Sequence, residues 1–303
     1  MAVPSYASPL ERTWYYAFRV ICVAIFVFLI APILIIMPLS FNVEPYFSFT
    51  EGMMSLDPDA YSTRWYEDIV RNGMAAPDAE FGWAWFNDMW NNAQWIRSFR
   101  NSFFIAICAT VLATALGTLA ALGLSRPEMP ARAMITSILI SPMIVPLVIT
   151  ATGMFFFYSD VGLAKTYLGV ILAHTTLGIP FVIITVTATL VGFDRSLIRA
   201  SNNLGADQTT TFFKVIMPLI LPGMISGALF AFITSLDEVV VVLFLADVEQ
   251  RTIPRQMWSG IREQISPTIL AVATILVLIS IALLTTVELL RRRSERLRGV
   301  RPT

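Results

Sequence analysis

The chain has 303 residues, of which 56 % are hydrophobic and only 14 % are charged. Soluble domains typically carry about 45–50 % apolar and about 25 % charged residues, so the composition excludes an ordinary soluble or disordered protein and indicates a membrane protein. Lys and Arg together number 21, as do Asp and Glu, so no excess of basic charge points to a nucleic acid as partner.

Long apolar stretches without Asp, Glu, Lys or Arg recur along the whole chain. A membrane-spanning helix needs about 20 predominantly apolar residues, and each stretch reaches that length. They are Val20–Val43, Asn101–Ser125, Ala133–Ser159, Thr166–Phe193, Val215–Leu236 and Gln264–Val287. We therefore predict an all-α polytopic membrane protein in which six transmembrane helices form a single domain over residues 1–303.

The distribution of basic residues predicts the orientation of these helices. With the N-terminus in the cytoplasm, the inner segments 1–19, 125–132, 194–214 and 288–303 hold 13 of the 21 Lys and Arg residues. Cytoplasmic loops are enriched in such residues. This predicts a cytoplasmic N-terminus (1–19), a first helix (20–43), a long outer loop (44–100), a membrane core (101–292) and a basic cytoplasmic tail (293–303) beside anionic lipid.

The residue types that support catalysis or bind metals are scarce. His174 is the single histidine, and neither an HExxH nor a Gly-x-Ser-x-Gly motif occurs, so we expect no catalytic site, no metal site and no bound cofactor. His174 is either a hydrogen-bonded packing residue or a substrate contact. Cys22 and Cys108 are expected at different depths in the membrane, which argues against a disulfide between them.

Prolines and small residues within the predicted spans affect their shape. Pro142, Pro146 and Pro180 are expected to kink their helices or to free backbone carbonyls, either for packing shape or for substrate coordination. Small residues allow helices to approach closely in lipid, and the second span carries four of them, Gly117, Ala120, Ala121 and Gly123.

The outer loop from Glu44 to Phe99 holds nine acidic residues against three arginines, together with five tryptophans. Tryptophan prefers the membrane interface, and exposed aromatic residues also anchor protein partners. The loop is therefore an interfacial segment, a docking surface for an extracytoplasmic protein, or both.

The polar segment between the fourth and fifth spans has the signals of a helical hairpin. Asp194 and Asp207 can each cap a short helix, and Gly205 suits the left-handed conformation at a helix end. Leu197, Ala200 and Leu204 share one helix face. A loop that only connects two spans needs no such hairpin, so we predict that a cytoplasmic partner binds this segment.

The sequence of this hairpin resembles the EAA loop of ABC importer permeases. That pattern is Glu-Ala-Ala, three residues, Gly, nine residues and then Ile-x-Leu-Pro. Here Arg199-Ala200-Ser201 is followed at the same spacing by Gly205 and by Val215-Ile216-Met217-Pro218. Arg199 stands where the family usually has Glu, and Ser201 replaces the second Ala.

Further segments resemble the spermidine/putrescine branch of the same family over nearly the whole chain. They are Thr63-Arg64-Trp65-Tyr66, Asn101-Ser102, Ser141-Pro142, Ile179-Pro180-Phe181-Val182, Gly192-Phe193-Asp194, Ser235-Leu236-Asp237-Glu238-Val239 and Ser266-Pro267. The resemblance implies the type I importer permease fold and a permease subunit that moves a small cationic, polyamine-like solute across the bacterial inner membrane by alternating access.

The resemblance also implies partner proteins that carry out the other steps of transport. A second, related permease subunit, two ATPase subunits at the cytoplasmic face and a periplasmic substrate-binding protein are expected. ATP and Mg²⁺ are expected on the ATPase, because no GxxxxGK[ST] phosphate-binding loop occurs in this chain. The residues implied in coupling to the ATPase are Arg199, Ala200, Ser201, Leu204, Gly205, Ala206 and Pro218.

Arg199 has three interpretations. The ATPase offers it an acid or a neutral acceptor, or the partner permease alone keeps the usual contact, or the side chain is solvent-exposed and contributes almost nothing.

Asp237 and Glu238 are predicted within the fifth span, where acidic residues are costly and therefore face protein or water. Their position in the outer half of the bilayer would suit a cationic substrate on the translocation pathway. Alternatively, one of them caps a break in the helix or pairs with the partner permease.

The rival function is an ion-coupled secondary transporter or channel with six spans, because intramembrane acids also serve proton-coupled uptake. A hairpin shaped for an ATPase favours the importer.

Overall fold

The computed structural model describes residues 8–126, 128–191, 193–194, 196–263 and 266–297. Within these residues the regular structure is helical, apart from one isolated antiparallel bridge between Asn42 and Tyr61. The chain forms two compact units, one of residues 1–72 with 260–303 and one of residues 73–259. The part of the predicted basic tail after Leu297 lies outside the described residues.

The first unit combines the two ends of the chain. Its helices are α1 (Pro9–Leu39), α2 (Glu51–Met54), η1 (Pro58–Ala60), α3 (Arg64–Arg71) and α14 (Thr268–Leu297). Ser8 and Glu11 form a capping box at the start of α1. Thr268 Oγ1 donates a hydrogen bond to Asp68 Oδ2 at 2.6 Å, which fixes the start of α14 next to α3.

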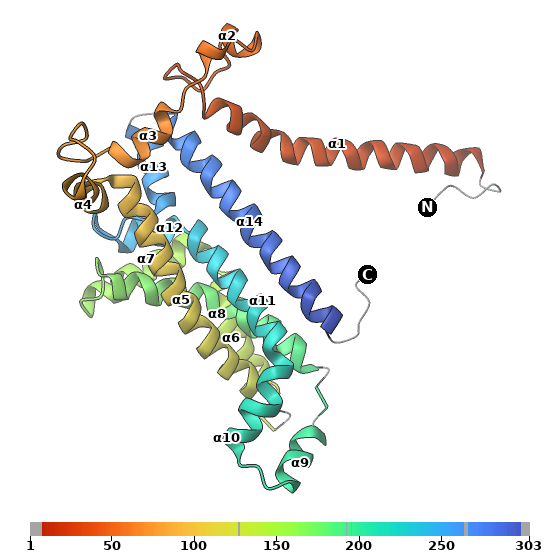
Figure 1. Cartoon of the computed structure of the whole chain (residues 1–303). Coiled ribbons are helices and arrows are strands. Elements are labelled where there is room, and N and C mark those ends of the chain that lie inside the picture. The colour runs from red at the N-terminus through yellow and green to blue at the C-terminus, as the bar shows by residue number, and fades with distance from the viewer. Residues whose placement is uncertain (1–7, 127, 192, 195, 264–265, 298–303) are drawn as a thin grey trace. The chain divides into compact units, whose positions relative to one another are not determined.

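The second unit contains most of the helices (Figure 1). They are α4 (Trp83–Asn92), α5 (Gln94–Leu124), α6 (Arg132–Ile144), α7 (Leu147–Asp160), α8 (Tyr167–Val191), α9 (Ser196–Asn203), α10 (Gln208–Thr211), the π-helical turn η2 (Phe212–Ile216), α11 (Met217–Asp237) and α12 (Val240–Leu245). Helix α13 (Ile253–Glu263) crosses the boundary between the two units. The long helices α5, α8 and α11 pack against one another.

Small residues bring α5, α8 and α11 into close contact. A Cβ atom on Gly117 would lie 2.7 Å from Cβ of Val182, and one on Gly178 would lie 3.0 Å from Cβ of Ala231. In lipid, where the hydrophobic effect does not drive helices together, such close packing is the main attraction between them. Of the four small residues predicted to serve it, Gly117 and Ala121 are buried.

The helix lengths agree with a chain that spans the membrane several times, but they do not reproduce the predicted six spans. Four helices are long and apolar enough to cross a membrane, Pro9–Leu39, Gln94–Leu124, Tyr167–Val191 and the continuous run Gln208–Asp237. A fifth span results if α6 and α7 count together, and the shorter apolar stretch of α14 covers Thr268–Ala282.

The predicted third span, Ala133–Ser159, is not one helix. It is divided into α6 and α7, which meet at an angle of 102°. Val145 adopts an extended conformation before Pro146, as steric conflict with a following proline favours. The predicted kink therefore occurs at Pro146 as a sharp bend, whereas α6 continues through Pro142 and α8 through Pro180.

His174 is the packing residue that one interpretation predicted. Its ring is buried, and Nδ1 lies 2.7 Å from Ser235 Oγ, which joins α8 to α11. Cys22 and Cys108 are both free thiols.

Candidate functional site: a coupling hairpin and a broken helix

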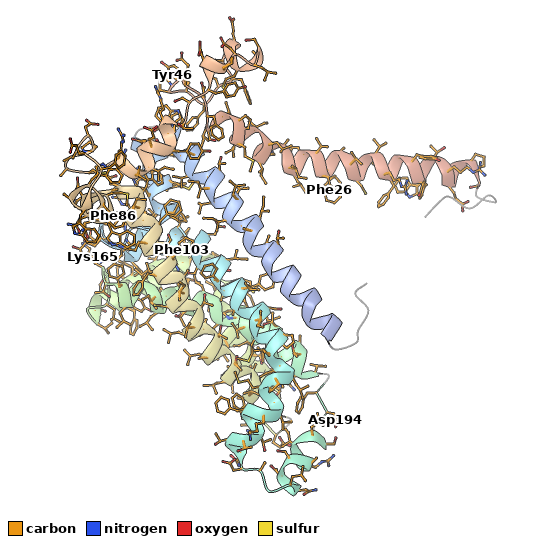
Figure 2. All side chains as sticks on the ribbon, viewed as in Figure 1. Phe26, Tyr46, Phe86, Phe103, Lys165 and Asp194 are labelled. Carbon is orange, nitrogen blue, oxygen red and sulfur yellow. The ribbon has the colours of Figure 1, made fainter. Side chains whose placement is uncertain are left out.

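The hairpin between α8 and α11 begins at Asp194, which is labelled in Figure 2 at the end of the second unit away from Phe86 and Lys165. The Asp194 carboxylate accepts hydrogen bonds from the Ser196 N–H at 2.8 Å and from Ser196 Oγ at 2.6 Å. These bonds favour the ionised form and hold the pKa of the Asp194 carboxyl below its usual range. The first predicted cap is therefore present at the start of α9.

Gly205 forms the turn of the hairpin. Its φ of +80° lies in the left-handed region, which glycine enters without steric cost. The Ala206 N–H donates to the Ser201 carbonyl at 3.1 Å and the Gly205 N–H to the Asn202 carbonyl at 3.0 Å, so carbonyls at the end of α9 are satisfied by the turn itself.

The second arm begins at Asp207, whose carboxylate accepts the Thr210 N–H at 3.0 Å and caps α10. Hydrogen bonds from Thr210 keep the pKa of the Asp207 carboxyl below its usual value. A buried contact of 2.9 Å between the hydroxyls of Ser201 and Thr211 then joins the two arms. The sequence contained no signal for this contact.

The predicted apolar face of α9 points away from the rest of the second unit. Leu197 and Ala200 are exposed, and the side chain of Leu204 is 88 % exposed. Arg199 and Gly205 are exposed beside them, whereas Ser201 is buried and Ala206 is half-buried. Pro218 is exposed near the start of α11. The hairpin therefore presents an apolar surface that no other described residue of the second unit covers.

A cavity of about 590 Å³ lies between this hairpin and the ends of α5 and α8. Leu122, Phe193 and Phe212 supply apolar lining, and Arg126 and Glu128 of the loop after α5 supply charge. Sequence reasoning treated that loop only as a carrier of basic residues and did not place it beside the hairpin.

Asp237 and Glu238 do not lie inside a continuous helix, which corrects the prediction. Helix α11 ends at Asp237, and Glu238 adopts an extended backbone conformation (φ −73°, ψ 121°) before α12 begins. Glu238 is 7 % exposed. Its Oε1 accepts the Val241 N–H at 2.8 Å and caps the start of α12, which is the helix-break alternative. Asp237 is exposed.

The two interruptions of apolar helices meet at one cavity of about 340 Å³. Leu147, which follows the bend at Pro146, lines it from one side. Thr234, Asp237 and Glu238 line it from the end of α11. Helix α7 packs against α12, so the bend and the break are held together.

The tryptophans of the long outer loop divide into structural and exposed side chains. Trp65 Nε1 donates to the Asn42 carbonyl at 2.6 Å, and Trp95 is buried. Trp83 and Trp90 of α4 are exposed, and the Phe86 ring stacks with both of theirs. Helix α4 therefore presents an aromatic face of the kind that either interpretation of this loop needs.

No metal site is evident among the residues that the structure describes, because no group of three or more His, Cys, Asp or Glu side chains could hold an ion there. The available chemistry is a shaped contact surface at the hairpin and a carboxylate beside a cavity at the helix break.

Comparison with known protein families gives one match over most of the chain. The family described as "Binding-protein-dependent transport system inner membrane component" matches residues 113–297. The spermidine/putrescine transport system permease protein PotC of Haemophilus influenzae is 33 % identical over 215 residues, which cover 71 % of this chain and 84 % of that protein. The putrescine transport system permease protein PotI of Escherichia coli K12 is 30 % identical over 262 residues, which cover 83 % and 82 %.

Solved structures show the same fold at low sequence identity. A bacterial ABC transporter involved in the import of the acidic polysaccharide alginate contains a chain that superposes with a TM-score of 0.68 at 16 % identity, covering 94 % of this chain and 99 % of that one. A second structure, the bacterial alginate ABC transporter in complex with an alginate pentasaccharide-bound periplasmic protein, gives a TM-score of 0.63 at 14 % identity and covers 94 % and 96 %.

Proposed function

Because this chain belongs to the family of inner membrane components of binding-protein-dependent transport systems, we propose that it is the permease subunit of an ATP-driven importer for a small cationic, polyamine-like solute. It moves this solute across the cytoplasmic membrane by alternating access. The ATPase is a separate subunit of such a system, so the permease chain itself is not an enzyme.

The observation that carries the proposal is the exposed hairpin. Its two caps, its glycine turn and the Ser201–Thr211 contact make it rigid, yet Leu204 at its tip is 88 % exposed. A rigid segment that exposes an apolar side chain is suited to docking into a groove of another protein. We assign that groove to an ATPase subunit, so that closure of the ATPases moves the hairpin.

The remaining partners follow from this division of labour. Two ATPase subunits bind ATP and Mg²⁺ at the cytoplasmic face, a second, related permease completes the membrane pathway, and a periplasmic binding protein delivers the solute. The alginate transporter that shares this fold has been solved with its periplasmic protein, which supports a binding protein as partner.

The length of α5 supports a placement of the two ends of the second unit on opposite sides of the membrane. From Arg97 to Ser125 the helix rises by roughly 42 Å at 1.5 Å per residue, which exceeds the ~30 Å hydrocarbon core of a bilayer. The hairpin therefore lies on the other side of the membrane from the start of α5. The basic residues around the hairpin, among them Arg126, Arg132 and Lys214, favour the cytoplasmic side for it, and both termini are then cytoplasmic.

Arg199 gives the coupling contact an unusual charge. The side chain is exposed on α9, and the resemblance implies a Glu at this place in most relatives. A basic contact residue on the ATPase would repel it. We infer that the ATPase partner of this chain offers an acid or a neutral acceptor opposite Arg199.

The two acids of the helix break have different roles in this proposal. Glu238 is buried and engaged in capping α12, whereas Asp237 is exposed beside the cavity. A free carboxylate at an unwound segment is suited to an ammonium group of a passing substrate. We therefore assign Asp237 to the translocation pathway and Glu238 to the support of the break.

Reconstitution tests the function directly. The chain is assembled in proteoliposomes with the ATPase, permease and binding protein encoded beside it, and uptake of labelled spermidine or putrescine is measured. We expect uptake only with ATP and Mg²⁺ on the ATPase side and the binding protein on the other side. Uptake that continues without ATP and follows an ion gradient instead would show a secondary transporter and overturn the proposal.

A further inference from the structure

A polar cavity lies at the end of the second unit that is remote from the coupling hairpin. Its volume is about 370 Å³, and Arg97 and Arg251 line it together with Asn92, Gln94, Ser98 and Gln256. No carboxylate is among its described lining residues. We call it the arginine pocket.

The two guanidinium groups are held in place but keep unused donors. Arg97 donates one hydrogen bond to the Val248 carbonyl at 2.9 Å. Arg251 donates to Gln256 Oε1 at 2.9 Å, and its Nε is buried without a hydrogen-bond partner in the described chain. Each guanidinium carries five N–H donors and no acceptor, so the pocket has an excess of donors and of positive charge.

The walls of the arginine pocket are fixed before any ligand arrives. Asn101 Nδ2 donates to the carbonyls of Glu249 and Arg251, at 2.6 Å and 3.0 Å. Ser102 Oγ accepts the Ile253 N–H at 2.8 Å. These bonds attach the segment that carries Arg251 to α5, which carries Arg97. Such preorganisation lowers the entropy cost of binding.

Two neighbouring acids, Asp247 and Asp88, are engaged by other groups. Asp247 faces Lys165, with 3.6 Å between Oδ2 and Nζ, and its carbonyl oxygen accepts a bond from Arg255. The carboxylate of Asp88 accepts the N–H groups of Ala75 and Ala76 and a bond from the Asn92 amide. A third guanidinium, that of Arg255, adds to the positive charge, and its pKa is lowered by burial and by the nearby Arg251.

We propose that the arginine pocket accepts a carboxylate side chain of the periplasmic binding protein when that protein docks on the permease. The assignment rests on the proposed function, which places this end of α5 on the periplasmic side of the membrane. Paired guanidinium donors match the geometry of a carboxylate. The cavity of about 370 Å³ leaves room for an inserted acidic side chain and bridging water.

The rim of the pocket favours a protein carboxylate over a free anion. Asn92 at the exposed rim ends α4, which also carries the exposed rings of Trp83 and Trp90. Aromatic side chains beside arginine are typical of protein interfaces.

The test measures binding of the substrate-loaded binding protein to the complete transporter in nanodiscs. We expect Arg251→Gln to raise the dissociation constant roughly tenfold or more, and Arg251→Lys, which keeps the charge but not the planar fork, to raise it less. Arg262→Gln is the matched control, because Arg262 is an exposed arginine of α13 that does not line the pocket. It should change the dissociation constant less than twofold.

Several outcomes would overturn the inference without touching the proposed function. One is unchanged affinity for Arg251→Gln in a transporter that still assembles with its ATPase. Another is inorganic phosphate stabilising the wild-type complex against heat, but not Arg251→Gln, while both bind the binding protein equally. If Arg251→Gln fails to assemble, Arg251→Lys decides, and an affinity equal to that of the wild type would overturn the inference. Loss of the ATPase from the wild-type complex would instead contradict the proposed function.

Discussion

Replacing Gly205 by alanine tests whether the shape of the coupling hairpin matters. The glycine adopts φ +80°, and a Cβ atom there would meet no atom within 4 Å. The substitution therefore adds no steric clash with neighbouring residues and changes only the backbone preference of one residue. Left-handed backbone costs a non-glycine residue about 1–2 kcal/mol, which corresponds to a roughly 5- to 30-fold smaller population of the native turn.

Hydrogen–deuterium exchange and ATPase activity measure this effect in the assembled transporter. We expect Gly205→Ala to speed exchange of the amides in residues 196–211 and to reduce the ATPase stimulation by the loaded binding protein. Gly205→Asn should lose less of the ATPase stimulation, because asparagine tolerates left-handed backbone better than alanine. Gly153→Ala is the control: Gly153 lies within α7 with nothing within 4 Å of an added Cβ, so alanine there should be neutral or slightly stabilising.

The result that would refute the reasoning is specific. If Gly205→Ala exchanges its hairpin amides at the wild-type rate and keeps full stimulated ATPase activity, the turn is not needed in its observed shape. If exchange rises while coupling stays intact, the hairpin does not act as a rigid lever.

Three other substitutions address the coupling charge, the pathway and the packing. Arg199→Glu should abolish the transport-coupled ATPase activity, and unchanged activity would show that Arg199 makes no coupling contact. Asp237→Asn should raise the substrate concentration for half-maximal uptake about tenfold, as loss of one charged hydrogen bond predicts; an unchanged value would remove Asp237 from the pathway. Gly227→Ala places a methyl group 2.5 Å from Thr185 Oγ1. It should cost about 1–3 kcal/mol through overpacking and lower the melting temperature of the purified complex.

The hairpin could be predicted from the sequence because its determinants are local. Asp194, Gly205 and Asp207 each act on backbone groups within three residues of themselves, so composition and spacing are enough to recognise them. The contact between Ser201 and Thr211 joins residues ten positions apart. The contact depends on how the turn orients the two arms of the hairpin, and no local sequence pattern predicts it.

The interruptions of the long helices could not be predicted in the same way. Pro142, Pro146 and Pro180 look equivalent in the sequence, yet only Pro146 separates two helices at a sharp angle. The sequence likewise allowed Glu238 to be a pathway group or a cap. Its capping bond to Val241 requires α12 to begin beside it, and α12 is held by packing against α7. Tertiary packing therefore decides both outcomes.

The coincidence of these interruptions has a physical reason. Unpaired backbone groups are not tolerated facing lipid, so helices break at membrane depth only where the freed groups meet protein or line a water-filled cavity. The bend after Val145 and the break at Glu238 border the same cavity, which Leu147 and Asp237 both line. Each interruption would be costly in a separate place, whereas together they border one cavity that the Asp237 carboxylate also lines. This sharing explains why an otherwise apolar bundle keeps two broken helices next to its exposed acid.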